Sequence, residues 1–443
     1  MRAAELAVEL ASTDPRRAAA LIREVGRPGA ACAEALAVAR RAEGLVASAR
    51  GDLRGAIRNL RDAIGLADRS GLPSRAAEAR ASLSYVLVLT GATADALLEV
   101  DRAATVLGGV RGAQVLMQRA LILTELGRFS EAEAGFEHAI RALRGAGGDA
   151  LVEGDLYTNR SILHSSLRAW RAADDDLARA AGLYARVGHD GRLALVEHNR
   201  AATAVIRGDL PAAFAHFDEA ERRYDAQGRH LGLLPVERAE ALLSARLIAE
   251  ARAAAQAGVD GFASQRNAVD LVRARLILAR AALAGGHTAE AREEADGARR
   301  SALTQRRPGW AAMAGYVALR ARWDGGDRGK AMVAAGRRAL RELDSGGWVV
   351  EAADARLIVS RLLLDLGRTA DARRVLGDSA AARWRGPADL RARAWHAEAL
   401  LRLATGDRRG AGAALHIRLD VLHRFRAGLD APELRAAATG ACV

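Results

Sequence analysis

Small and large apolar residues recur along the chain with a period close to 39 residues. The clearest copy is the stretch LGRFSEA at 126–132, in which a glycine is followed five residues later by an alanine. The glycine position, here called the anchor, recurs at intervals of 36 to 41 residues and is occupied by Thr13, Gly51, Gly91, Gly127, Arg168, Gly208, Arg246, Gly286, Gly326, Gly367 and Gly406. Alanine stands five residues after every anchor. Because helices often end in a left-handed residue, usually glycine, each anchor is predicted to end one helix and precede the next.

Other positions around the anchor follow helical spacing. Seven residues before it the side chain is small in nine of the eleven repeats, Leu6 and Leu319 being the exceptions. A large apolar residue often follows the alanine by four residues, which is the spacing of one helix face. Antiparallel helices approach closely where the contacting side chains are small. The pattern predicts an all-α, right-handed superhelical solenoid of about eleven hairpins over residues 1–425, followed by a tail at 426–443.

The order small, Gly, Ala, large, Ala resembles that of tetratricopeptide (TPR) repeats, whose usual period is about 34 residues. The stretches EHNRA (197–201), RGDLPAA (207–213) and FDEAE (217–221) resemble the N-terminal helical region of actinobacterial CHAT-domain proteins. Further resemblance lies at 159–161, 307–312 and 434–438.

In that family the repeats precede a caspase-like peptidase domain with a catalytic His and Cys. No His-Gly turn follows a strand-like run here, and the tail at 426–443 is interpreted as the remnant of a junction to a missing domain. The resemblance therefore implies an adaptor or sensor arm. Whether the peptidase is lost from a truncated family member or encoded as a separate chain stays open.

Composition agrees with a helical, non-membrane protein. Half of the residues are hydrophobic, only 4% are aromatic, and there are 8 prolines. No apolar run reaches the roughly 18 to 20 residues that span a bilayer. The first residues, MRAAELAVELASTDPRR, lack the apolar core of a secretory signal. These features predict a cytoplasmic protein without membrane association.

The charge balance raises nucleic acid as an alternative partner. The formal net charge is +12, and only Lys330 among the 66 basic residues is lysine. Residues 299–443 hold 27 basic and 15 acidic side chains, whereas residues 1–298 hold 39 of each. A nucleic-acid or regulatory module in the basic last third is therefore the second hypothesis. The lack of aromatic stacking pairs and of a helix-turn-helix signature makes nucleic acid an unlikely partner.

Candidate chemistry is sparse, so neither catalysis nor a cofactor or metal is predicted. Cys32 and Cys442 are far apart in the sequence, and Cys32 is interpreted as a small packing residue of the first hairpins. The run 174–176, three aspartates, is interpreted as a solvated helix face. The stretch GGDRGK at 325–330 lacks the leading Gly and final Ser or Thr of a phosphate loop and falls on a repeat turn.

Two sets of residues are candidates for binding a protein or peptide partner. Asn159 and Asn199 stand nine residues before their anchors, where an inward amide can hold a peptide backbone or its terminal carboxylate. The alternative is a hydrogen bond to a neighbouring loop. Six residues before the anchor, the later repeats carry Arg280, Arg320 and Arg361, which predicts a cationic stretch for an acidic segment. The alternative is that these arginines pair with acids on the next helix, such as Arg280 with Glu240.

Overall fold

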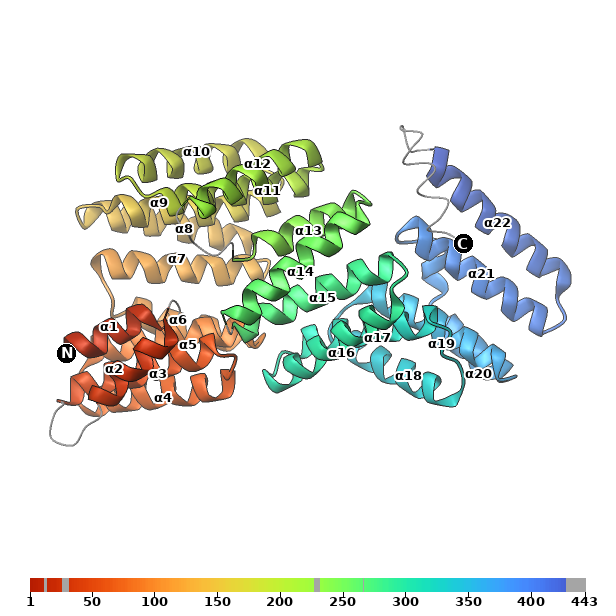
Figure 1. Ribbon diagram of the computed structural model, residues 1–443, viewed down its shortest axis with the longest axis horizontal. Helices are drawn as coiled ribbons and strands as arrows, with labels where there is room; N and C mark the ends of the chain where they lie inside the picture. Colours follow the sequence, from red (N-terminus) through yellow and green to blue (C-terminus); the bar gives the residue numbers. More distant parts are fainter. Residues whose placement is uncertain (12–13, 26–31, 227–231, 266, 428–443) are drawn as a thin grey trace. The chain divides into compact units, whose positions relative to one another are not determined.

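The computed structural model describes residues 1–11, 14–25, 32–226, 232–265 and 267–427. In that part of the chain it consists of 22 α-helices and one short 3-10 helix, without any strand (Figure 1). Consecutive helices pair as antiparallel hairpins, so the predicted all-α hairpin array is confirmed. The tail from 428 onward, with Cys442, lies outside the described residues.

The chain divides into two compact units. The N-terminal unit comprises residues 1–245, 253–274 and 304–307, and the C-terminal unit comprises 246–252, 275–303 and the described residues from 308 onward. The first seven hairpins use helices α1 (Arg2–Leu10), α2 (Pro15–Val25), α3 (Ala33–Ala49), α4 (Leu53–Arg69), α5 (Pro73–Leu89), α6 (Thr93–Ala104), α7 (Gly109–Glu125), α8 (Phe129–Gly145), α9 (Ala150–Ser166), α10 (Trp170–Arg186), α11 (Asp190–Arg207), α12 (Leu210–Asp225), α13 (Leu234–Ser244) and α14 (Ile248–Ser264). The last four use α15 (Ala268–Ala284), α16 (Thr288–Thr304), α17 (Pro308–Asp324), α18 (Lys330–Ser345), α19 (Val349–Asp365), α20 (Thr369–Gly377), η1 (Ala380–Arg383), α21 (Ala388–Ala404) and α22 (Arg408–Ala427).

The anchors end the first helix of each hairpin, as predicted. Every anchor within the described residues has a positive φ, from 58° at Arg168 to 91° at Gly326. In the third such turn the amide of Arg128, just after the anchor, donates to the carbonyl of Leu123 at 2.9 Å. This hydrogen bond satisfies one of the carbonyls left free at a helix end. The first anchor, Thr13, lies outside the described residues.

The alanine that follows each anchor is buried in ten hairpins, and Ala331 is the exception. Helix α18 begins at Lys330, four residues after Gly326, whereas the other described second helices begin two residues after their anchor. The longer turn rotates Ala331 outward and places Met332, fully buried, at the helix crossing. One turn later Gly336 takes the position of a large residue, and a Cβ there would collide with Val359. Relative to the other hairpins, Met332 therefore takes the place of the small residue at the crossing, and Gly336 takes the place of the large residue one turn later.

First helices of successive hairpins pack against one another in both units. In the N-terminal unit α1 contacts α3, α3 contacts α5, α7 contacts α9, α9 contacts α11 and α11 contacts α13, and in the C-terminal unit α17 contacts α19 and α19 contacts α21. No comparable packing joins second helices among the described residues. Because the first helices are the closer row, they form the inner face of each stacked unit. None of the described helices has the length and apolar character needed to cross a membrane.

The N-terminal unit also contains a contact that joins its ends. Val269, at the start of α15, belongs to the buried cluster formed by Leu53, Leu83 and Val86 of α4 and α5. The turn at 304–307 supports it, because Gln305 Nε2 donates to the Ala268 carbonyl at 2.7 Å. Solenoid repeats ordinarily contact only their neighbours, so this return contact is an addition to the repeat plan.

Candidate partner-binding face

The inner face of the N-terminal unit carries a row of apolar side chains. The residues six positions before the anchors on α3, α5, α7, α9 and α11, called here the apolar row, are Leu45, Tyr85, Leu121, Ile162 and Ala202. Tyr85 is 53% exposed and Ile162 is 41% exposed, whereas Leu45 and Leu121 are half-buried. Tyr85 and Ile162 can therefore give apolar contact area to a partner without leaving the hydrophobic core.

A polar row lies nine positions before the anchors and includes Gln118, Asn159 and Asn199. Gln118 Nε2 donates to Ser84 Oγ at 2.8 Å and to the Ala81 carbonyl at 3.0 Å, so it joins α7 to α5. Asn159 Nδ2 donates to Met117 Sδ at 3.2 Å, which is a weak acceptor. Its contact is with the neighbouring helix rather than with a loop. The side-chain amide of Asn199 is half-buried and forms no hydrogen bond with another described residue.

Ion pairs hold neighbouring first helices in register. The carboxylate of Glu78 on α5 is 5% exposed and pairs with Arg41 on α3, Arg75 on α5 and Arg111 on α7. Burial, together with the positive charges of Arg111 and Arg75, lowers the pKa of Arg41 to about 10. Because three guanidiniums use the acceptor sites of the Glu78 carboxylate, this group serves the packing of the helices.

The aspartate run at 174–176 is not a wholly solvated face. Asp176 is 1% exposed and accepts from Arg160 Nη2 at 2.6 Å and Nε at 2.9 Å. His164 Nδ1 lies 3.0 Å from Asp176, and its Nε2 lies 3.1 Å from Glu133. The hydrogen bond to Asp176 and the charge of Glu133 raise the pKa of His164 despite its partial burial. The solvated-face interpretation was wrong for Asp176 because its position faces α9.

The three arginines of the C-terminal unit differ in their surroundings. Arg280 on α15 is exposed, and no ion pair joins it to another described residue. Glu240, its suggested partner, instead accepts from Arg273 at 2.9 Å. Arg361 places its guanidinium 5.7 Å from the centre of the Trp323 ring. Arg320 Nη1 lies 2.7 Å from Asp354 on α19, the next first helix.

Asp354 is the centre of a buried polar cluster. It is 2% exposed, accepts from Tyr316 Oη at 2.7 Å, and pairs with Arg393 on α21 at 2.5 Å. Burial alone would raise the pKa of Asp354, but the charges of Arg320 and Arg393 outweigh it and lower that pKa. Arg320 therefore neutralises a buried carboxylate and supports the stacking of three first helices.

The structure also decides how Cys32 and the glycine-rich stretch at 325–330 are to be interpreted. Cys32 is exposed at the residue before α3, so it does not pack as a small core residue. The segment 325–329 forms the turn between α17 and α18, in which Asp327 pairs with Arg322 at 2.8 Å. Within the described residues there is no group of three His, Cys, Asp or Glu side chains placed to hold a metal ion.

The sequence carries a signal for the acids that form ion pairs between first helices. Glu78, Asp155 and Asp354 all stand thirteen residues before their anchors. Two of them pair with an arginine sixteen residues before the next anchor: Glu78 with Arg111, and Asp155 with Arg192 at 3.0 Å. An acid and an arginine at fixed offsets in successive repeats indicate an ion pair between adjacent first helices.

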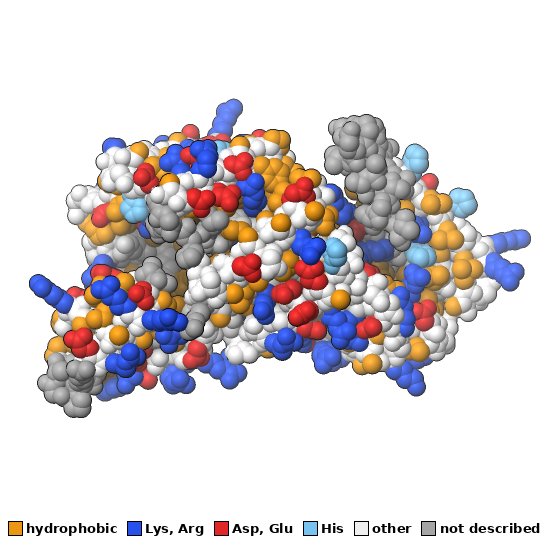
Figure 2. Space-filling model, viewed as in Figure 1, with side chains coloured by type: hydrophobic (Ala, Val, Ile, Leu, Met, Phe, Trp, Pro, Cys, Tyr) orange, Lys and Arg blue, Asp and Glu red, His pale blue; other side chains and the backbone are white. Residues whose placement is uncertain are grey.

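Charges of both signs are intermixed over the face shown in Figure 2. Several arginines of the last third are paired within the fold: Arg299 with Glu342, Arg356 with Asp344 and Arg383 with Glu398. Because each pair uses one acid as well as one arginine, the surplus of basic side chains in this part of the chain is unchanged.

Comparison with known proteins shows the fold. No protein-family model and no curated protein sequence matches the chain. Among solved structures, the apo form of RapI aligns with 84% of this chain and 99% of its own at a TM-score of 0.53 and 8% identity. Yeast Tom70 aligns with 92% of this chain and 70% of its own, with a TM-score of 0.40 and 12% identity. A STAND protein with a tetratricopeptide repeat sensor from Pyrococcus horikoshii aligns over 84% of this chain and 52% of its own, with a TM-score of 0.40 and 11% identity.

At 8% identity the likeness to RapI concerns the fold, a TPR-like stack of helical hairpins. It transfers no activity, and the resemblance to CHAT-domain proteins remains a prediction of the sequence.

Proposed function

We propose that the chain is a non-catalytic scaffold that binds an extended segment of a partner protein on its inner face. The observation that carries this proposal is the apolar row, where Tyr85 and Ile162 expose apolar surface on parallel first helices. Beside it, Asn159 contacts only a thioether and Asn199 keeps its amide available. Apolar side chains beside one weakly bonded and one free side-chain amide suit an extended peptide, which offers both side chains and backbone hydrogen-bonding groups.

The surrounding ionisable groups support a binding role rather than catalysis. Glu78, Asp176 and Asp354 are each engaged by arginines, so their charges serve the packing of the helices. A rigid surface loses little entropy on binding, and this favours recognition of a flexible segment.

Peptide display gives a direct test. A library of random linear peptides would be selected on the intact protein, and the enriched peptides measured by fluorescence anisotropy against Tyr85→Ser and Ile162→Ser. Each substitution removes buried contact area and should weaken binding by about tenfold, equivalent to 1.4 kcal/mol.

Leu98→Ser provides the matched control. Leu98 lies on α6, the second helix of the same hairpin as Tyr85, and is 50% exposed. Its replacement should leave peptide binding unchanged. Equal binding by wild type, Tyr85→Ser and Ile162→Ser would refute the inner face as the binding site.

The acidic preference of the partner is a separate part of the proposal. Among the three predicted arginines, exposed Arg280 has the most freedom to contact a carboxylate, whereas Arg320 is held by Asp354. Arg280→Gln should therefore weaken binding of an acidic peptide, and the loss should shrink at high salt because exposed charges are screened. An unchanged affinity would remove acidity from the proposal.

A further inference from the structure

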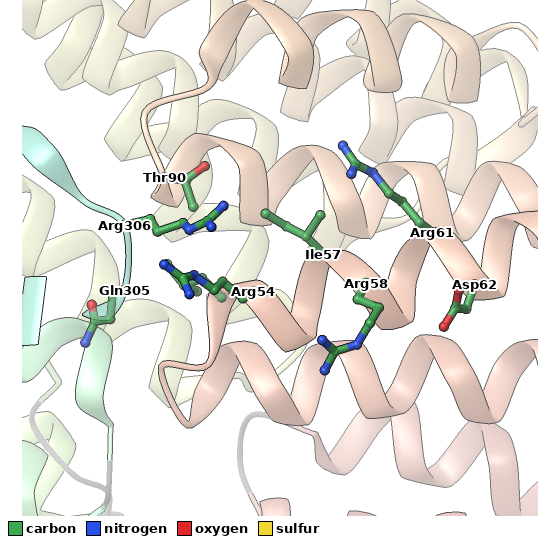
Figure 3. Close-up of a pocket in the computed structure, with 9 residues that line it drawn as sticks. Arg54, Ile57, Arg58, Arg61, Asp62, Thr90, Gln305 and Arg306 are labelled. Atoms are coloured by element: carbon green, nitrogen blue, oxygen red, sulfur yellow. The ribbon is translucent and has the colours of Figure 1, made fainter. Parts of the chain in front are cut away.

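Four arginines surround a hollow in the N-terminal unit, on the second-helix side of a hairpin. Arg54, Arg58 and Arg61 lie on α4, and Arg306 lies in the turn after α16 (Figure 3). The hollow has a volume of about 400 Å³. Its other lining residues are Leu53, Ile57, Asp62, Thr90 and Gln305.

The charge around this hollow is not balanced by the protein. All four arginines are exposed, and none forms an ion pair with another described residue. Asp62, the one acid in the lining, stands four residues after Arg58, yet no ion pair joins the two. Elsewhere in this unit arginines meet acids, as Arg160 does with Asp176. Like charges gathered without a counter-ion repel each other, so an anion in the hollow would be stabilised.

The turn that brings Arg306 to α4 is held firmly. Gln305 is 3% exposed and donates to the Ala268 carbonyl, and Arg307 Nη1 donates to the Val269 carbonyl at 2.8 Å. Between them Arg306 has φ of 56°, a left-handed conformation that disfavours residues with a Cβ. Figure 3 shows its side chain directed toward α4, close to those of Arg54 and Thr90. The fold thus holds the backbone of Arg306 in a position that brings its guanidinium close to that of Arg54.

We propose that this hollow binds a small anion that carries at least two phosphate groups. Arginine presents a planar fork of donors that matches phosphate oxygens. From Arg54 to Arg61 the helix advances about 10 Å, so the guanidiniums are spread over more than one phosphate can contact. Ile57 and Leu53 add an apolar wall on which an organic part of the ligand can rest.

Isothermal titration calorimetry with inorganic tripolyphosphate at low salt tests the site. The wild-type protein should bind it, and Arg54→Gln should weaken binding about tenfold, as expected for one lost charge-assisted contact. Arg306→Gly should weaken it to a similar extent. Because glycine accepts the left-handed conformation, this variant should keep its melting temperature, which separates loss of the site from loss of the fold.

The matched control is a triple variant on α18, Arg337→Gln with Arg338→Gln and Arg341→Gln. These three arginines are exposed and lie in the C-terminal unit. Full binding by this variant, with weakened binding by Arg54→Gln and Arg306→Gly, would establish the site. An equal loss in the control would show attraction by net charge alone and overturn the proposal.

Three other results would also overturn it. The first is no binding of tripolyphosphate by the wild type. The second is a pentaglutamate peptide that competes as well as tripolyphosphate, which would make the ligand a carboxylate. The third is duplex DNA that binds more tightly and loses affinity in Arg54→Gln, which would make the surface a nucleic-acid contact.

Discussion

Removing the buried carboxylate of Asp354 should destabilise the C-terminal unit far more than removing its partner Arg320. In Asp354→Ala the guanidiniums of Arg320 and Arg393 lose their shared acceptor, and the Tyr316 hydroxyl loses its partner at 2.7 Å. Arg320 keeps Asp324 at 3.5 Å and Arg393 keeps Asp389 at 2.9 Å, so neither guanidinium is left unpaired. The loss of three contacts to one charged group should still cost about 3 to 5 kcal/mol in total.

Arg320→Gln leaves a smaller defect. Asp354 keeps Arg393 and Tyr316, and the lost guanidinium was 23% exposed and close to water. The expected cost is about 1.5 to 3 kcal/mol, the range of one hydrogen bond to a charged group. Replacing Arg280, Arg320 and Arg361 together by Gln should therefore lower stability mainly through Arg320.

Urea unfolding followed by tryptophan fluorescence measures both variants. Five of the six tryptophans lie at or beyond residue 310, in the C-terminal unit, so the signal reports that unit. The free energy of unfolding should fall in the order wild type, Arg320→Gln, Asp354→Ala. A midpoint for Asp354→Ala equal to the wild type, or a larger loss in Arg320→Gln, would refute the assignment of Asp354 as the centre of the cluster.

Two further predictions concern the packing of the hairpins. Because the pKa of His164 is raised in the fold, its contribution should be complete below its unfolded value of about 6.5 and should disappear as the pH rises through the folded pKa; thermal melts between about pH 5.5 and 8.5 should show this slope in wild type and not in His164→Gln. Ala132→Leu should cost about 1 to 3 kcal/mol by overpacking a buried crossing. Ala331→Leu should stay within about 0.5 kcal/mol because that alanine is exposed, and equal urea midpoints for the two variants would contradict the shifted register of α18.

The repeat itself was predictable because the same steric requirement returns in each hairpin. Anchors such as Gly127 and Arg168 adopt the left-handed conformation, and alanines such as Ala132 are buried at the crossings. The apolar row lies on successive first helices for the same reason. When each hairpin has the same geometry, a residue's position relative to the anchor is enough to predict where its side chain lies.

Features that depend on departures from the repeat were not predictable in this way. The lengthened turn before α18 moves Met332 inward, and nothing in the alanine pattern signals it. Cys32 is exposed because it precedes a helix rather than lying within one. The role of Arg320 depends on a carboxylate in the next repeat, which a single-position comparison does not reveal.

The return contact of the N-terminal unit changes how such a chain can fold and be divided. Val269 reaches a cluster that includes Leu53, more than two hundred residues earlier. Closing so long a loop is entropically unfavourable and slow compared with stacking of neighbouring hairpins. Early hairpins would therefore form first with Gly51 and Leu53 still open to solvent, and the unit would be completed only when α15 arrives. A fragment that stops before residue 268 would lack its final closing step, so this part of the array is not freely modular.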